Sequence, residues 1–196
     1  MDETRSCAAP LAYGDAMRWD ALFADLEAQL DAGQAAELAL EVADRQRAEQ
    51  AGVALADRVR AHAGQGLRMW LRDGSTVEGT VGDAAAEWVV LHDGPAQLLV
   101  PWAGVVSVAG LSRLVAPPAG QVLARLGLRH ALRALARDRV AVRLYVERGE
   151  LTGTIDRVGA DHVDVAEHVP GESRRPGAVR AVRTVRTAAL LAVRST

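Results

Sequence analysis

The segment Val77-Glu78-Gly79-Thr80-Val81 recurs 74 residues later as Leu151-Thr152-Gly153-Thr154-Ile155. The residues that follow are also shared, because Val89-Val90-Leu91 returns as Val163-Asp164-Val165 at the same offset. Apolar and polar residues alternate along most of these segments, which is the period of a half-buried β-strand. A self-similar pattern at a fixed offset is the mark of a repeated structural unit. The sequence therefore predicts a duplicated β unit.

The match extends to both sides of these segments. Upstream, Leu67, Met69 and Leu71 correspond to Val140, Val142 and Leu144, and downstream, Val105, Val106 and Val108 correspond to Leu190, Leu191 and Val193. Asp73-Gly74 is typical of a hairpin turn that needs a positive φ. Pro101 to Gly104 predicts a tight connector with one turn of 3₁₀ helix before the fifth strand of the first copy. Gly79 and Gly153 lie in mid-strand, where a sharp bend would leave no room for a side chain.

Helical patterns precede the first copy and separate the two copies. Trp19, Phe23, Leu26 and Leu30 recur at spacings of three and four residues, and Asp31-Ala32-Gly33 is interpreted as a stop. A second helix is then expected from about Gln34 to His62, which makes residues 16–64 a helical hairpin. A further helix is expected from about Gly120 to Asp138, after Pro117-Pro118.

We therefore predict an α+β protein: an N-terminal α-helical hairpin followed by two tandem SH3/Sm-like five-stranded β-barrels joined by a helix. The expected organisation is a disordered tail (1–15), the hairpin (16–64), the first barrel (65–112), a linker with its helix (113–139) and the second barrel (140–196). A barrel of this size is near the lower limit for an independent core, so the copies are expected to rely on further packing.

Residues 67–108 resemble the first half of an Sm-like (LSm) barrel, and residues 140–194 resemble it more loosely. The motifs are Leu71-Arg72-Asp73-Gly74, Val77 to Val81 and Trp88 to Leu91. Other SH3-like modules share this order of motifs. The whole chain is also similar in composition and layout to an actinobacterial protein family. The resemblance implies a small barrel, and Sm-like proteins commonly form rings that bind single-stranded RNA.

The chain departs from the Sm-like pattern at the positions that bind uridine in that family. Asp83-Ala84-Ala85-Ala86 stands where an aspartate and an asparagine would be expected after the second strand. The Arg-Gly position carries Pro101-Trp102 in the first copy and Arg186-Thr187 in the second. The resemblance therefore implies the fold but not the uridine pocket.

Composition and single residues argue against an enzyme, a cofactor or a metal site. Cys7 is the only cysteine, so no intrachain disulfide can form, and a reducing cytoplasm is the expected location. Neither a signal peptide nor a membrane span is predicted. His162, Asp164 and His168 could be imagined as a metal or acid–base cluster, but a polar outer strand face explains them equally well. We expect no catalytic residue.

Arginine is the residue type that raises a functional hypothesis. The chain has no lysine, its net charge is −2, and residues 113–139 hold six arginines against one acid. Nucleic-acid or partner binding is the hypothesis for Arg125, Arg129, Arg133, Arg137, Arg174 and Arg175. Trp70, Trp88 and Trp102 are candidates for base stacking if exposed. Because arginine is the default cation here, such a cluster is weaker evidence for phosphate binding than usual.

Two functions stay open at this point. The preferred one is a non-enzymatic interaction or scaffold module built from duplicated small β-barrels, with a protein partner or self-association. The alternative is an RNA- or DNA-binding regulatory protein that uses the arginine-rich helix and the second barrel. The acidic N-terminal helices and the weakly acidic net charge favour the first.

Overall fold

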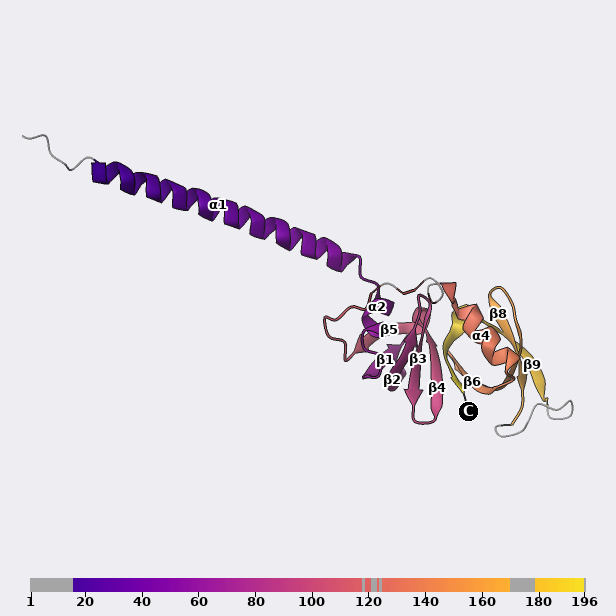
Figure 1. Cartoon of the computed structure of the whole chain (residues 1–196). Coiled ribbons are helices and arrows are strands. Elements are labelled where there is room, and N and C mark those ends of the chain that lie inside the picture. Colours follow the sequence, from indigo (N-terminus) through magenta and orange to yellow (C-terminus); the bar gives the residue numbers. More distant parts are fainter. Residues whose placement is uncertain (1–15, 118, 121–122, 124, 170–178, 196) are drawn as a thin grey trace, which may run out of the picture. The chain divides into compact units, whose positions relative to one another are not determined.

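The computed structural model describes residues 16–117, 119–120, 123, 125–169 and 179–195. The predicted disordered tail lies outside these residues. The chain divides into two compact units, residues 1–52 and 53–196. The first contains a long helix, and the second contains a ten-stranded sheet in which every strand pairing is antiparallel, so the mixed α+β class is confirmed (Figure 1).

The predicted helical hairpin is wrong. Helix α1 (Ala16–Ala51) runs for 36 residues without a break, straight through the expected stop. A glycine inside a helix costs only about 1 kcal/mol relative to alanine, and good helix formers surround Gly33. The second predicted helix ends early, at Ala51, and a short helix α2 (Leu55–Arg60) follows in the other unit.

The first half of the sheet consists of five strands in the order β5-β1-β2-β3-β4. Alternating burial places Leu67, Met69 and Leu71 in the core, as the pattern predicts. Gly74 has a φ of 85° in the turn that follows β1, and a 3₁₀ helix precedes β5 as expected. The elements are β1 (Gly66–Leu71), β2 (Thr76–Ala84), β3 (Trp88–Asp93), β4 (Ala96–Pro101), η1 (Trp102–Gly104) and β5 (Val105–Ala109).

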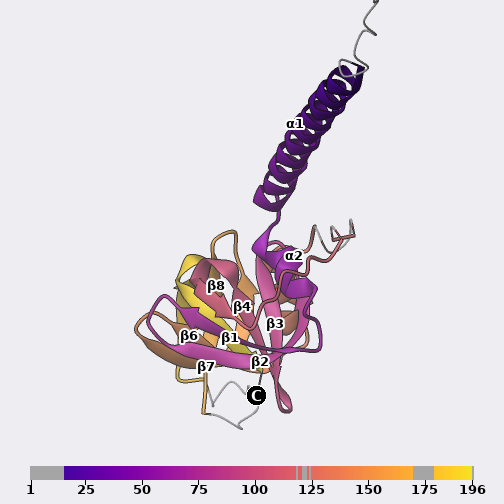
Figure 2. The ribbon, with the colours of Figure 1, turned by 90° about the vertical axis from the view of Figure 1, so that its left-hand side faces the viewer.

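The second half has the same order of elements, with its strands arranged β10-β6-β7-β8-β9. Strand β7 pairs with β8 as the predicted hairpin, and a 3₁₀ helix again precedes the last strand. In Figure 2 the first half lies toward the viewer. The elements are β6 (Ala141–Val146), β7 (Gly149–Val158), β8 (His162–Glu167), β9 (Ala181–Arg186), η2 (Thr187–Ala189) and β10 (Leu190–Ser195).

The two mid-strand glycines stand where a side chain would collide, as expected. A Cβ on Gly79 would lie 2.8 Å from the carbonyl oxygen of His92. One on Gly153 would lie even closer to the carbonyl oxygen of Ala166. Both contacts are with the backbone of the neighbouring strand, which cannot move aside cheaply, so the close approach of the strands requires glycine here.

Strand β10 joins the two halves into one sheet. It pairs with β6 on one side and with β4 on the other, where Val193 lies opposite Leu99. The hydroxyl of Ser195 accepts a hydrogen bond from the backbone N–H of Gln97 (3.0 Å), and Arg194 forms an ion pair with Asp93 (2.7 Å). The last strand of the second half is therefore an interior strand of the whole sheet.

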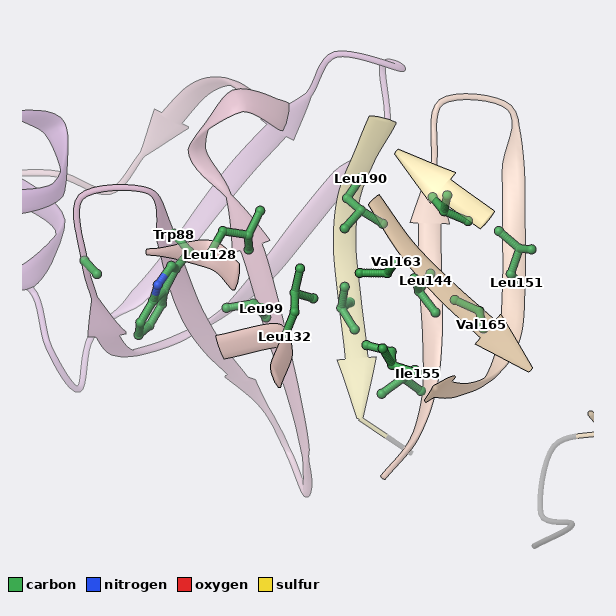
Figure 3. Packing of buried hydrophobic residues seen from close by; sticks show 14 residues of the cluster. Trp88, Leu99, Leu128, Leu132, Leu144, Leu151, Ile155, Val163, Val165 and Leu190 are labelled. Atoms are coloured by element: carbon green, nitrogen blue, oxygen red, sulfur yellow. The ribbon is translucent and has the colours of Figure 1, made fainter. Parts of the chain in front are cut away.

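The apolar core forms two clusters that share β10. Leu191 and Ala192 are fully buried in the cluster of the first half, whereas Leu190 and Val193 belong to the other cluster. That second cluster draws residues from three sources: β3 and β4, helix α4 (Leu128–Arg137), and the second half (Figure 3). Each half thus completes its core with side chains from outside itself.

Candidate functional site

Helix α4 holds three of the six predicted arginines, Arg129, Arg133 and Arg137, and its first turn is fixed by the loop before β3. Glu87 accepts a hydrogen bond from the backbone N–H of Leu128 (2.7 Å), so a carboxylate caps the positive end of the helix. A Cβ on Gly127 would lie 2.9 Å from Oε2 of Glu87, and glycine therefore lets the carboxylate reach the helix. The indole N–H of Trp88 donates to the carbonyl oxygen of Leu126 (2.8 Å).

The two faces of α4 differ sharply. Leu128 and Leu132 are buried in the core cluster, which orients the helix over β7. The opposite face carries Arg129, Arg133 and Arg137, all exposed. Residues four apart lie on one side of a helix, so the three guanidinium groups form one row.

The predicted helix from about Gly120 to Asp138 needs correction, because it is interrupted. Leu123 and Arg125 are helical but residues 126–127 are not, and α4 begins at Leu128, because Gly127 is extended and Glu87 caps the next residue. Arg125 is exposed but precedes α4, so it is not part of the row on that helix. Arg174 and Arg175 lie outside the described residues.

The arginine row has few acidic neighbours. Arg137 forms an ion pair with Asp138 (3.4 Å), and both side chains are well exposed, so water weakens it. Within the described parts of the chain, neither Arg129 nor Arg133 forms an ion pair. The guanidinium groups of Arg129 and Arg133 are therefore suited to phosphate or carboxylate groups of a partner.

The three tryptophans considered for base stacking have different environments. Trp88 is buried, and its indole N–H is already bonded inside the protein. Trp102 is half-buried and donates its indole N–H to the carbonyl oxygen of Ala85 (2.8 Å). Only Trp70 of these three is exposed, at 37%, and it lies on β1 rather than beside α4. The structure therefore does not join the tryptophans and the arginine row into one surface.

The imagined histidine cluster separates into three independent contacts. His162 donates a hydrogen bond to Asp161 (2.9 Å), which holds the pKa of that exposed carboxyl below its ordinary value. Asp164 accepts from the hydroxyl of Thr184 (2.7 Å), and His168 is buried against the hydroxyl of Thr154 (2.9 Å). Among the described residues no group of three or more such ligands is arranged to hold a metal ion.

Helix α1 presents an exposed apolar surface. Its apolar stripe consists of Trp19, Leu22, Phe23, Leu26 and Leu30. These side chains are exposed, with Trp19 at 59%, Phe23 at 57% and Leu30 at 64%. The rings of Trp19 and Phe23 have centroids 6.4 Å apart, so they form one apolar surface. Exposed apolar patches of this kind mark interaction sites in folded proteins.

The two ends of the sheet are the remaining candidate surfaces. Within the described residues, β5 and β9 each have a single neighbouring strand. An edge strand presents unpaired backbone N–H and C=O groups that another strand can bind. The repeat pattern located β5, but it did not show which of the ten strands would lie at the ends of the sheet.

Comparison with known proteins finds no family model that matches the chain and no curated protein similar to it. A further observation concerns membranes. In the part of the chain that the structure describes, no helix combines the length and apolar character needed to cross a bilayer.

Proposed function

We propose that this protein is a non-enzymatic interaction or scaffold module, and that helix α1 is its main partner-binding element. The observation that carries the proposal is the exposed apolar stripe from Trp19 to Leu30. A helix gains most of its stability from packing an apolar face, and the apolar face of α1 is exposed to water at a cost in free energy. A partner that covers the stripe would remove this cost, as a groove does when it binds an amphipathic helix.

The partner's chemistry follows from the charges of α1. The helix contains eight acidic residues and three arginines, and Asp20, Asp25 and Glu27 flank the apolar stripe. A matching groove would be apolar at its floor and rimmed by arginine or lysine. Complementary charges of this kind raise the association rate and select the partner.

The second unit, residues 53–196, is proposed to be a duplicated small β-barrel of the Sm-like or SH3-like kind. Support comes from the shared order of elements in the two halves and from the matching registers. A register shift follows Val81 in the β2–β3 pairing and follows its counterpart Ile155 in the β7–β8 pairing. A reducing, cytoplasmic location is part of the same proposal, because Cys7 has no second cysteine to pair with.

The test is a comparison of matched helix variants. The double variant Phe23→Glu/Leu26→Glu places two carboxylates in the stripe, whereas Ala28→Glu/Ala35→Glu adds the same charge on the opposite face. We expect the wild type and the second variant to capture the same stoichiometric partner from cells that express the protein, and the stripe variant to lose it. The proposal would be refuted if the stripe variant captured the partner as well as the wild type does, or if none of the three proteins captured a stoichiometric partner.

Nucleic-acid binding is the second candidate, favoured by the unpaired Arg129 and Arg133 on α4. Titration with short single-stranded RNA at two salt concentrations would then show a steep loss of affinity with salt. The variant Arg129→Glu/Arg133→Glu should abolish this binding without unfolding the chain, because both side chains point to solvent. Negligible binding at low salt, or binding that survives the charge reversal, would exclude α4 as the interface.

A further inference from the structure

The two edge strands of the sheet have opposite chemical character. Strand β9 carries exposed Arg183 and Arg186, and charged side chains on an edge discourage the addition of another strand. Strand β5 reads Val-Val-Ser-Val-Ala and contains no charged residue. Its Val106 is 69% exposed. An uncharged, apolar edge is the one on which a further strand can pair at least cost.

The counterpart of β5 in the second half shows what a strand in this position does. Strand β10 has a second neighbour, β4, and through this joint Leu191 and Ala192 are fully buried. The residues at the corresponding places on β5 are Val106 and Ser107, and both are exposed. The first half therefore presents, uncovered, the strand surface that the second half buries.

We propose that β5 pairs antiparallel with β5 of a second copy of this chain, about a two-fold axis close to Ser107. This pairing extends the sheet through the dimer and brings no charge opposite another. Pairing β9 with itself would set arginines against arginines across the strands. In the joint between the two halves, the buried Leu98 of β4 lies beside β10. Pairing β5 with β9 in the same way would put Arg183 in the place of Leu98, and burying its charge would cost free energy of desolvation.

The expected assembly is closed and weak. A two-fold interface uses the same surface on both copies and leaves no free β5 edge for further growth. A strand of five residues spans only about 17 Å, so the contact is small by the standards of stable dimers. The inference is independent of the proposed role of α1, since it uses a different surface and a different partner.

Cysteine cross-linking of the full chain tests the geometry. In a Cys7→Ser background, Ser107→Cys places two thiols across the axis. Opposed Cα atoms in an antiparallel pair lie about 4.5–5.5 Å apart, which a disulfide can bridge. The matched control is Thr184→Cys, an exposed position on β9. We expect S107C to form a covalent dimer at least about tenfold faster than T184C, because only the former is held at bonding distance.

Sedimentation across a concentration series tests the energetics. Val106→Glu introduces a carboxylate on each side of the axis and should raise the dimer dissociation constant at least about tenfold, since like charges close together across strands repel. The control Val182→Glu, on the exposed face of β9, should leave it unchanged.

Three results would overturn the inference. A wild-type chain that stays monomeric throughout the series would show that β5 recruits no second copy. A mixed cross-link between S107C and T184C chains would show head-to-tail pairing of β5 with β9 instead. A dimer that survives V106E but is lost in the α1 stripe variant would assign self-association to the helix, and that outcome would leave the proposed function of α1 standing.

Discussion

Strands β4 and β9 occupy the same place in the two halves of the sheet, yet one is interior and the other is an edge. Strand β4 reads Ala-Gln-Leu-Leu-Val-Pro, and its last four residues are buried beside β10. Strand β9 reads Ala-Val-Arg-Thr-Val-Arg, and only Val185 is buried. Equivalent order along the chain therefore does not imply equivalent environment, and the residue types follow the environment.

The last strands of the two halves, β5 and β10, differ in the same way, but here the interior strand belongs to the second half. Strand β10 is buried on both sides, whereas β5 has one neighbour among the described residues. The comparison teaches that the joint between the halves, rather than either half alone, sets the burial of these strands. Four predictions test this comparison, beginning with the joint itself.

The largest effect is expected at Leu191 of β10. It is fully buried in the core of the first half, so Leu191→Ala should lower the free energy of unfolding by about 2–5 kcal/mol. The counterpart substitution Val106→Ala, on exposed β5, should change it by less than about 0.5 kcal/mol. Urea unfolding of the two variants measures the difference, and similar losses would show that the two strands have equivalent environments after all.

The next effect concerns the mid-strand glycines, at which the halves should behave alike. Gly153→Ala and Gly79→Ala each force a Cβ against a neighbouring backbone, and overpacking of this kind costs about 1–3 kcal/mol. Gly153→Ala should be the worse of the two because its contact is closer. Gly66→Ala, at a position with nothing within 4 Å of the added carbon, is the control. A neutral Gly153→Ala in thermal unfolding would contradict the close approach of β7 and β8.

A smaller effect is expected at the first residue of β3 and of β8. Trp88→Phe removes the hydrogen bond to Leu126 beside α4 and leaves a carbonyl unpaired, at a cost of about 1–2 kcal/mol. The counterpart His162→Phe removes a hydrogen bond to the exposed Asp161 and should cost less than about 0.5 kcal/mol. Chemical denaturation reports both values. Equal costs would mean that α4 does not depend on the indole.

The smallest effect is the pH dependence of the β1–β2 turn. Hydrogen bonds from the hydroxyl and backbone of Ser75 lower the pKa of Asp73 from its ordinary 3.8, so the folded state favours the ionised carboxyl. Its contribution is therefore present above that value and is lost as the pH falls through the folded pKa. Asp73→Ala should be slightly less stable than the wild type at neutral pH and equal to it in acid. Thermal unfolding at several pH values would show a constant difference if the carboxyl played no part.

Sequence patterns predicted the strands well because strand alternation and turn residues are local. The β1–β2 turn at Gly74, the 3₁₀ turn before β5 and the hairpin from Leu151 to Val165 follow from residues a few positions apart. The pairing of β4 with β10 could not be found in this way, since no local pattern states which edge of one half meets the other.

The helices show the limits of stop signals. Gly33 was interpreted as a helix end, but its modest cost is outweighed by neighbouring residues with high helix propensity. The four-residue spacing of Arg129, Arg133 and Arg137 is a local signal, and all three are exposed on α4. The cap supplied by Glu87, 41 residues away from Leu128, has no local signal. The candidate surfaces on β5 and β9 could be located only from the order of the strands in the sheet, which the sequence does not state.

Strand β10 has a consequence for how the chain matures. Because β10 follows the other nine described strands in the chain, β4 and the core of the first half remain uncovered until β10 has been synthesised and has left the ribosome. The first half is therefore expected to be trapped by chaperones or to aggregate when translation stalls before that point. Quality control of this protein then acts on the nascent chain as a whole rather than on one half at a time.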